Sequence, residues 1–240
     1  MENPSVVSVV IPVHNGAKYL KQAVESVRCQ RWPNLEILIV DDGSTDDTAD
    51  VARSLGASIQ LISQEQSGAA VARNRGVAEA QGKWLAFLDA DDLWTESKLE
   101  LQINTLQSNP SIDIVFGHVV QFICPTLSVK EKALLACPPD AVPGFHPGTM
   151  LLEKATFLNI GEFDTQWDVG EFVDWYAKAI EMGVKSTMLT DILMKRRLHN
   201  TNQGIYKRDS YSRDYLRILR ASLLRRRSST SDSSPQTQKD

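Results

Sequence analysis

The sequence predicts an α/β fold in which a doubly wound, mostly parallel sheet forms a single domain. Short runs of β-branched and aliphatic residues alternate with amphipathic segments as far as residue 108. Turn-forming or acidic residues follow these runs, and a length of 240 residues suits one ordinary domain. Because strands that alternate with helices form right-handed β-α-β units, the pattern builds a parallel sheet with helices on both faces.

Four strands are predicted in the first part of the chain, each a short, mainly apolar run that suits burial on both faces of a sheet. They are residues 6–11, 35–40, 58–62 and 84–88. The first is followed by Pro12, and the second and fourth end in clusters of aspartates. The predicted sheet therefore carries polar residues beyond the carboxyl ends of its strands.

Helices are predicted between these strands. The first, residues 18–31, has apolar side chains at helical spacing, namely Leu20, Ala23, Val24 and Val27. Two others are predicted over residues 68–80, which are rich in alanine, and over residues 95–108. Such amphipathic helices cover the faces of a parallel sheet.

The helix after the second strand is predicted to run through Leu55. Thr45 or Ser44 is a suitable N-cap, because a side-chain oxygen accepts from the free N–H groups of the first turn. Asp46 and Asp47 would then fall in that first turn, where the helix dipole favours negative charge.

The second part of the chain is less regular. Residues 114–122 predict a fifth strand, and residues 124–148, rich in Pro and Gly, predict a long irregular connection of a kind that is commonly functional. Regular secondary structure is expected again over residues 150–157, and a helix is expected over residues 170–182.

Two strand-like pieces at residues 185–189 and 192–198 precede a last helix over residues 211–224. The end of the chain is rich in Ser, Thr, Asp and Gln, a composition typical of disorder. We therefore divide the chain into a single folded domain (1–207), a basic C-terminal helix (208–227) and a disordered tail (228–240).

Composition and missing motifs disfavour several classes of protein. Three cysteines without C-x-x-C spacing predict neither a disulfide framework nor a zinc site. The absence of G-x-G-x-x-G, G-x-x-x-x-G-K-[ST] and G-x-S-x-G disfavours an NAD dehydrogenase, a P-loop NTPase and an acyl hydrolase. With no secretory signal and no apolar run long enough to cross a bilayer, we expect a cytoplasmic protein.

The charge is unevenly distributed along the chain. The net charge is −4, but residues 195–227 carry 11 basic and two acidic side chains, against 14 and 26 over residues 1–194. A basic segment of this kind contacts phosphate, an anionic membrane surface or the acidic body of the same chain, or is simply a solvated helix face. Peripheral membrane contact is therefore one hypothesis, and no nucleic-acid partner is expected.

Asp89, Asp91 and Asp92 directly follow the strand over residues 84–88, so three carboxylates project from one strand end. Like charges held this close repel each other unless a cation neutralises them. Oxygen ligands suit Mg²⁺ or Mn²⁺, which complete their coordination shells with water and substrate phosphates. A helix cap is the alternative role, but it accounts for one aspartate and not for three.

Asp41 and Asp42 end the neighbouring strand, where a carboxylate can accept from a base N–H or a ribose hydroxyl. Arg73 lies one helix away from both acidic clusters, where it either pairs with them or holds a diphosphate. A capped turn and an internal salt bridge are the alternative roles. In doubly wound sheets, ligands bind beyond the carboxyl ends of the strands, which is where both clusters are expected.

Five motifs in this order resemble the family-2 glycosyltransferases, a group with the Rossmann-like GT-A fold of nucleotide-diphospho-sugar transferases. They are Val10-Ile11-Pro12-Val13-His14-Asn15, Val40-Asp41-Asp42-Gly43-Ser44-Thr45-Asp46, Ala72-Arg73-Asn74-x-Gly76, Gly82-x-x-Leu85-x-Phe87-Leu88-Asp89-x-Asp91-Asp92 and Gly161-x-Phe163-Asp164. The resemblance extends over residues 6–200 and leaves the basic helix and the tail outside it.

The resemblance implies an inverting transferase that moves a sugar from a nucleotide-diphospho-sugar donor, UDP-linked, to an acceptor hydroxyl. Asp89 and Asp91 match a D-x-D pair that contacts the ribose and a divalent metal, Mg²⁺ or Mn²⁺. That metal acts as a Lewis acid on the leaving nucleotide. The implied donor-binding residues are Pro12, His14, Asn15, Asp41, Asp42, Ser44, Arg73, Asp89 and Ala90.

His199 stands where relatives often have an Arg-x-His element near the donor phosphates. The resemblance implies that it either forms the metal site with Asp91 or donates to a phosphate. A structural histidine is the alternative. Trp167 and Trp175 flank the expected acceptor side, where they either stack on a sugar or fill the core. The resemblance leaves the acceptor open among glycan, lipid, peptide and metabolite.

The catalytic base is where this sequence departs from the family pattern. Relatives usually carry adjacent Glu-Asp at the start of the helix after the acceptor loop, whereas Phe172 occupies the usual base position here. Glu171 and Asp174 share a helical face at i, i+3, so either can replace the base, and Glu171 is favoured. Helix capping is the alternative role of Glu171.

Two other functions stay open at this stage. Phe172 also suits a catalytically silent protein that binds a nucleotide sugar or acts as a scaffold. A nucleotidyltransferase with a similar crevice is less favoured, because no basic triphosphate-binding loop follows the first strand.

Overall fold

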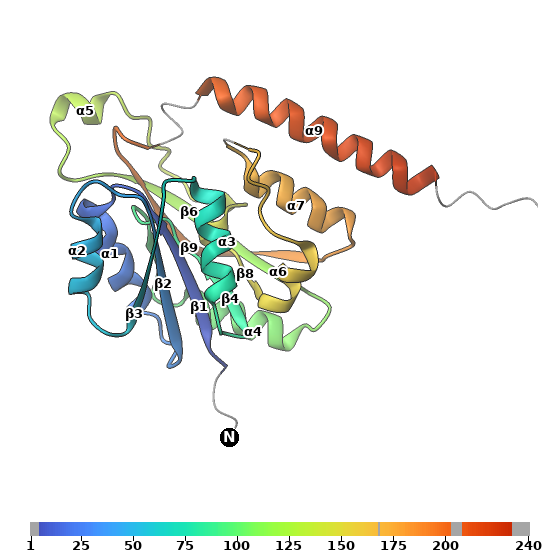
Figure 1. Cartoon of the computed structure of the whole chain (residues 1–240), viewed down its shortest axis with the longest axis horizontal. Coiled ribbons are helices and arrows are strands. Elements are labelled where there is room, and N and C mark those ends of the chain that lie inside the picture. The colour runs from blue at the N-terminus through green and yellow to red at the C-terminus, as the bar shows by residue number, and fades with distance from the viewer. Residues whose placement is uncertain (1–4, 168, 203–207, 232–240) are drawn as a thin grey trace, which may run out of the picture.

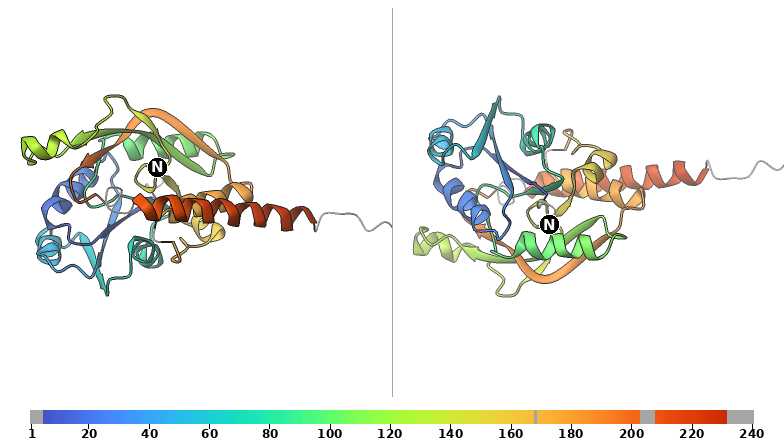
Figure 2. Two further views of the ribbon diagram at one scale, coloured as in Figure 1. Left: turned by 90° about the horizontal axis from the view of Figure 1, so that it is seen from above. Right: turned by 90° about the horizontal axis from the view of Figure 1, so that it is seen from below.

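The computed structural model describes residues 5–167, 169–202 and 208–231, which form a mixed α/β fold (Figure 1). The described residues contain one nine-stranded sheet with the order β3-β2-β1-β4-β8-β6-β9-β5, and β7 pairs with β6. Helices lie on both sides of this sheet, as the views from above and below show (Figure 2). The predicted doubly wound α/β class is confirmed.

Parallel strands make up the first half of the sheet. They are β1 (Val7–Val13), β2 (Leu35–Asp42), β3 (Ile59–Gln64) and β4 (Trp84–Phe87). β1 lies between β2 and β4 and is buried at every position. Because the three strands are parallel, their carboxyl ends meet at one edge of the sheet, and both aspartate clusters lie there.

The second half of the sheet is mixed. It contains β5 (Leu93–Trp94), β6 (Ile114–Ile123), β7 (Val142–Gly144), β8 (Leu151–Glu153) and β9 (Ser186–Leu198). β8 runs antiparallel to β4 and β6, whereas β9 runs parallel to β6. The two strand-like pieces predicted over residues 185–198 form the single strand β9, whose register with β6 shifts around His118. A bulge at this point explains the interrupted apolar pattern.

Two sets of helices cover the two faces. α1 (Ala17–Arg28), α2 (Thr48–Ser54) and α4 (Lys98–Ser108) pack on one face, and α3 (Ala69–Glu79), α6 (Lys154–Ile160) and α7 (Glu171–Glu181) pack on the other. In β1, Val9 and Ile11 contact the first set and Val10 contacts the second. The strand is continuously apolar because both of its faces are covered.

The connection between β6 and β8 contains more regular structure than predicted. It includes α5 (Val129–Ala133), β7 and the 3₁₀ helix η1 (Pro147–Thr149). A reciprocal capping box starts α5: Ser128 Oγ accepts from Glu131 N, and the Glu131 carboxylate accepts from Ser128 N. This pattern was available in the sequence and predicts a short helix inside the irregular segment.

The start of α2 differs from the prediction. The helix begins at Thr48, so neither Ser44 nor Thr45 caps it, and the expected first-turn aspartates precede it. A contact from another loop holds these residues instead, because Asn15 Oδ1 accepts from Thr45 N at 2.8 Å. A tertiary hydrogen bond has therefore taken the place of a local cap.

The last helix, α9 (Arg208–Ser231), lies over α7 and projects beyond the rest of the domain (Figures 1 and 2). It is longer than the predicted 211–224 and includes residues 228–231 of the predicted disordered tail; the rest of that tail lies outside the described residues. No helix in the described part of the chain has the length and apolar character needed to span a membrane.

Candidate active site

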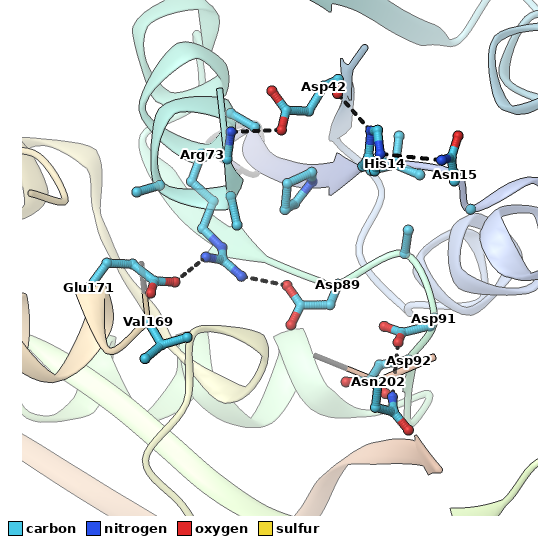
Figure 3. A pocket seen from close by; sticks show the side chains of 18 of the residues that line it. His14, Asn15, Asp42, Arg73, Asp89, Asp91, Asp92, Val169, Glu171 and Asn202 are labelled. Carbon is cyan, nitrogen blue, oxygen red and sulfur yellow. Dashed lines mark hydrogen bonds and ion pairs between the residues drawn. The ribbon is translucent and has the colours of Figure 1, made fainter. Parts of the chain in front are cut away.

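A cavity of about 920 Å³ opens at the carboxyl ends of β1, β2 and β4. The loops after these strands, the first turns of α3, the loop before α7 and the end of β9 supply its lining. Figure 3 shows part of it. The predicted site residues that line it are Pro12, His14, Asn15, Asp42, Arg73, Asp89, Ala90, Asp91, Glu171 and His199. Asp41, Ser44 and Asp174 are not among the lining residues.

Asp42 ends β2 and is buried, and its carboxylate is engaged by the protein itself. Oδ1 accepts from Gln64 Nε2 at 2.7 Å and from Ser67 N at 2.8 Å, while Oδ2 accepts from Gly68 N at 2.8 Å. Ser67 and Gly68 directly precede α3, where the helix dipole favours an anion. Asp42 therefore fixes the loop that forms one wall of the cavity.

His14 and Asn15 tie together the loops that follow β1 and β2. His14 Nδ1 donates to the Asp42 carbonyl oxygen at 2.8 Å (Figure 3). Asn15 adopts a left-handed conformation, with φ at 52°, and its N–H donates to Ser44 Oγ at 2.9 Å. Asp41 Oδ1 accepts from Ser44 N at 3.0 Å. Asp41 and Ser44 thus hold the turn behind the cavity wall.

Arg73 is the central cation of the site. Its side chain is 6% exposed, and its Nη2 and Nη1 lie 2.7 Å from Asp89 Oδ1 and 2.6 Å from Glu171 Oε1 (Figure 3). Burial acts to lower the pKa of Arg73, but Asp89 and Glu171 raise it above its ordinary value. Burial likewise acts to raise the pKa of Asp89, and Arg73 reverses the effect, so this pKa is lowered. Arg73 therefore keeps Asp89 ionised.

His146 is a cavity residue that the sequence did not reveal. It comes from the long connection before η1, and its Nε2 lies 3.5 Å from Asp89 Oδ2. Gly148 N donates to His146 Nδ1 at 3.0 Å, so Nε2 carries the hydrogen of the neutral ring. Burial lowers the pKa of His146, which favours that neutral form. A lone histidine in an irregular segment carries no sequence signal for such a role.

Asp91 and His199 meet across the cavity from Arg73. His199 Nε2 lies 2.9 Å from Asp91 Oδ2, and Asn202 Nδ2 donates to the same oxygen at 3.3 Å. The other ring nitrogen of His199 lies 2.8 Å from Thr201 Oγ1, a hydroxyl that can either donate or accept. Thr201 N donates to this ring nitrogen at 3.3 Å, and the Asp91 carboxylate oxygen accepts, so Nε2 carries the hydrogen of the neutral ring. The two predicted metal residues are therefore adjacent and hydrogen-bonded to each other.

Asp92 and Arg197 support the backbone behind this pair. Asp92 is buried, and its Oδ1 accepts from Arg197 N at 2.8 Å. Burial, with Asp91 and Asp89 as like-charged neighbours, raises the pKa of Asp92 well above its ordinary value. Arg197 Nε donates to the Asp91 carbonyl oxygen at 2.8 Å, and its guanidinium lies 4.8 Å from the ring centre of Tyr19. The third aspartate thus has a structural role.

Glu171 and Asp174 lie in the first turn of α7 but have different surroundings. Glu171 reaches the cavity and Arg73, whereas Asp174 is 1% exposed and pairs with Lys178 Nζ at 2.7 Å and Arg225 Nη1 at 3.2 Å. The shared face expected from their i, i+3 spacing therefore does not bring both carboxylates to one site. Helix α9, which supplies Arg225, covers Asp174.

The two tryptophans are also separated. Trp175 is fully buried among the aromatic side chains under α7, and its indole N–H donates to the Gly161 carbonyl at 2.7 Å. Trp167 lines the cavity with its ring below the guanidinium of Arg217, at 5.0 Å. Its indole N–H has no hydrogen-bond acceptor within the described residues. Trp175 therefore fills the core, whereas Trp167 lines the cavity beside α9.

A divalent metal ion needs oxygen or nitrogen ligands that converge on one point. The described residues contain no group of three His, Cys, Asp or Glu side chains arranged around one point. They do bring one carboxylate oxygen and one imidazole nitrogen together at Asp91 and His199. Mg²⁺ and Mn²⁺ are commonly held by one or two protein ligands, with water and substrate phosphates completing the shell. This pair fits that mode of binding.

The mixed sheet and the cavity at its strand ends define a GT-A-type fold. The model of glycosyl transferase family 2 matches residues 8–160, and the chain belongs to this family. The match includes the residues from Pro12 to Asp92 that line the cavity, and Glu171, His199 and α9 lie beyond it.

Known relatives agree with this assignment. An uncharacterized glycosyltransferase of Rickettsia typhi is 31% identical over 222 residues, which cover 86% of this chain and 69% of the relative.

Two solved structures have a similar fold at a TM-score of 0.65. One is residues 1–349 of S. aureus TarS in complex with UDP-GlcNAc, 19% identical, covering 82% of this chain and 59% of that one. The other is the mannosyltransferase PcManGT from Pyrobaculum calidifontis in complex with GDP-Man and Mn²⁺, 23% identical, covering 86% of this chain and 61% of that one. This chain thus spans about three fifths of each.

Proposed function

We propose that the protein transfers a sugar from a nucleotide-diphospho-sugar, UDP-linked, to an acceptor hydroxyl, with inversion at the sugar carbon and with Mg²⁺ or Mn²⁺. One observation carries this proposal: Arg73, Asp89, Asp91 and Glu171, which come from three distant segments, converge on one cavity. Nucleotide sugars bound to solved proteins of similar fold support the choice of donor.

The donor is proposed to lie across the strand ends. Pro12, His14 and Asn15 face the half of the cavity beside Asp42, where the base and ribose would bind. Asp89 lies between Asp91 and the Arg73–Glu171 pair (Figure 3), an arrangement that suits the diphosphate and the sugar. Arg196 also lines this region and can contact phosphate oxygens.

Glu171 is the proposed base. The acceptor oxygen forms a bond to the sugar carbon, the bond from that carbon to the diphosphate oxygen breaks, and the hydroxyl proton passes to the Glu171 carboxylate. Because Arg73 holds Glu171 Oε1 at 2.6 Å, the proton would be accepted at Oε2. Attack on the face opposite the diphosphate inverts the configuration of the carbon.

Asp91 and His199 are the proposed metal ligands. A bound divalent ion would supply Lewis-acid stabilisation of the negative charge on the leaving diphosphate. Asn202 holds Asp91 in position from the side away from Arg73. Asp89, in contrast, is engaged by Arg73 and His146, so we assign it to the donor and not to the ion.

The alternative is a protein that binds the nucleotide sugar without turnover. Phe172 at the usual base position and the close pairing of Glu171 with Arg73 favour this second candidate. We propose the cytoplasm as the site of action, since Cys29, Cys124 and Cys137 are all free thiols.

A panel of nucleotide sugars tested for thermal stabilisation, with and without Mn²⁺, would test donor binding, because a ligand that binds the folded state raises the apparent stability. We expect one donor to stabilise the protein and the effect to need the metal. Asp91→Asn should lose the metal-dependent stabilisation, whereas the control Asp113→Asn, outside the cavity, should keep it. Metal-dependent binding without release of nucleoside diphosphate, even with acceptor mixtures, would favour the silent alternative.

A further inference from the structure

Helix α9 presents an apolar stripe to solvent. Leu216, Leu219 and Leu223 recur at i, i+3 and i+7, and they are 69, 60 and 57% exposed. Leu224, also 57% exposed, extends the stripe at one side. Large apolar side chains that gather on one exposed helix face mark an interaction surface more often than scattered ones do.

Basic side chains border this stripe. Arg220 lies on one side of the leucines and Arg226 on the other, as the rotation of about 100° per residue requires. Arg217 follows next to Arg220 and is 54% exposed. A leucine stripe bordered by arginines is typical of helices that lie in the plane of an anionic lipid surface.

The opposite side of α9 is anchored to the domain. Asp214, Ile218 and Ser222, at i, i+4 and i+8, are buried. Ser222 Oγ donates to Glu181 Oε1 at 2.5 Å, and Arg225 Nε donates to Glu181 Oε2 at 2.7 Å. The exposed stripe is roughly 130° around the helix from this buried face, so docking on α7 leaves it uncovered.

The anchoring contacts also reach the cavity. Arg217 lies over the ring of Trp167, and Ile218 packs so close to Gly170 that an added Cβ there would lie 2.9 Å from Ile218 Cδ1. Trp167 and Gly170 both line the cavity, and the next residue is Glu171. A surface bound to the outer face of α9 would therefore lie near the acceptor side.

We propose that α9 binds an anionic lipid surface through the face formed by Leu216, Leu219 and Leu223 and its bordering arginines. Bound in this way, the helix holds the acceptor side of the cavity close to that surface. The inference rests on the proposed function only in calling this side of the cavity the acceptor side.

The charges favour lipid over a second copy of the chain. Two copies packed through this stripe would bring Arg217, Arg220 and Arg226 of each helix close to those of the other, and like charges at close range are unfavourable. Residues 1–194 carry 14 basic and 26 acidic side chains, so an anionic bilayer repels the body of the domain and attracts this helix. The charge distribution thus also orients the protein.

Co-sedimentation with vesicles tests the proposal. The full chain should sediment with vesicles of phosphatidylcholine and phosphatidylserine in a two-to-one ratio, and far less with phosphatidylcholine alone. The variant L216S/L219S/L223S should lose at least ten-fold in vesicle affinity, and Arg220→Glu should weaken binding to the anionic vesicles. The control L134S/L158S removes two leucines that are 85 and 56% exposed elsewhere, and it should bind as the unaltered chain does.

Three results would overturn the proposal. The first is an unaltered chain that stays in the supernatant with anionic vesicles, and the second is equal binding by the stripe variant and the control. The third is a lipid-free dimer in sedimentation velocity that the stripe variant converts to monomer, which would assign the face to a second copy. Thermal unfolding of each variant shows whether lost binding reflects a lost fold.

Donor binding separates this proposal from the proposed function. The stripe variant should keep the thermal stabilisation by nucleotide sugar, because the leucines do not line the cavity. If the unaltered chain does not bind vesicles but is stabilised by the nucleotide sugar, the proposed lipid-binding surface is rejected and the proposed function is not affected. Vesicle binding without any donor stabilisation would reject the proposed transfer reaction and leave the lipid surface standing.

Discussion

Replacing Arg73 with methionine should strongly destabilise the protein. The guanidinium lies 2.7 and 2.6 Å from two carboxylates, and the side chains of Arg73, Asp89 and Glu171 are 6, 28 and 17% exposed. At an effective dielectric constant of about 20, each such pair has a Coulomb energy on the order of 4–6 kcal/mol before desolvation is counted. Truncation leaves both anions without their shared cation, and breaking a buried pair in this way costs about 3–5 kcal/mol.

The cost should depend on pH. Arg73 lowers the pKa of Asp89 against the effect of burial, so its stabilising effect is complete above the ordinary Asp value of 3.8 and is lost as pH falls through the folded-state pKa. In Arg73→Met the pKa of Asp89 rises, and protonation then relieves the uncompensated charge. The stability difference between the two proteins should therefore be largest near neutral pH and shrink as the pH approaches about 4.

Urea unfolding followed by circular dichroism at several pH values measures this difference. Arg75→Met is the matched control, because Arg75 lies on the same helix, is 56% exposed and pairs with Glu79 at 3.7 Å; it should cost no more than about 0.5 kcal/mol. A loss below about 1 kcal/mol for Arg73→Met at neutral pH, or a loss that does not change with pH, would refute the reasoning.

Three further predictions concern single positions. Glu171→Gln should reduce transfer by about 10²–10⁴-fold and leave donor stabilisation in place, and activity within about tenfold of the unaltered enzyme would exclude Glu171 as the base. Gly170→Ala should cost about 1–2 kcal/mol in urea unfolding, because φ is +86° and Ile218 is in the way. Gly56→Ala, with φ at +96° and open space around it, should show the backbone cost alone. Burial acts to raise the pKa of Cys124, but hydrogen bonds with Thr126 and Tyr19 lower it to about 6. We therefore expect a thiolate absorbance that titrates near pH 6 and that is absent in Cys124→Ser. Because the pKa of Cys124 is lowered, the free energy of unfolding should increase as pH rises from about 6 to the ordinary thiol value of 9.0. If the difference in this free energy between the unaltered chain and Cys124→Ser does not widen over this range, the assignment is contradicted.

The parallel half of the fold and its aspartate clusters were predictable from local pattern. Buried parallel strands are apolar throughout, and residues that follow them must gather at one edge of the sheet. This reasoning places Asp42, Asp89 and Asp91 on one cavity without knowledge of any contact. It does not separate lining residues from supporting ones, such as Asp41 and Ser44, which hold the turn behind the cavity wall.

The remaining features depend on contacts between distant segments. Glu171 and Asp174 share one face of a helical wheel, but Asp174 does not line the cavity and pairs with Arg225, 51 residues further along the chain. His146 reaches Asp89 because η1 orients it, and Asn15 holds the start of α2 in place of a cap. Periodicity describes the faces of single elements, and it does not show which faces meet.

The Asp42 network also determines where a phosphate can be bound. The amino-terminal end of α3 is an obvious place for the diphosphate in a doubly wound fold, yet the protein's own carboxylate already occupies it. The start of α1 is filled in the same way, because Ala17 N donates to Asp46 Oδ2 at 3.2 Å. With both helix ends occupied by the protein's own carboxylates, a diphosphate bound as we propose would depend on Arg73, Arg196 and a divalent ion for positive charge. On the proposed function, donor affinity would therefore vary with the concentration of divalent cations, because these two helix ends are already occupied.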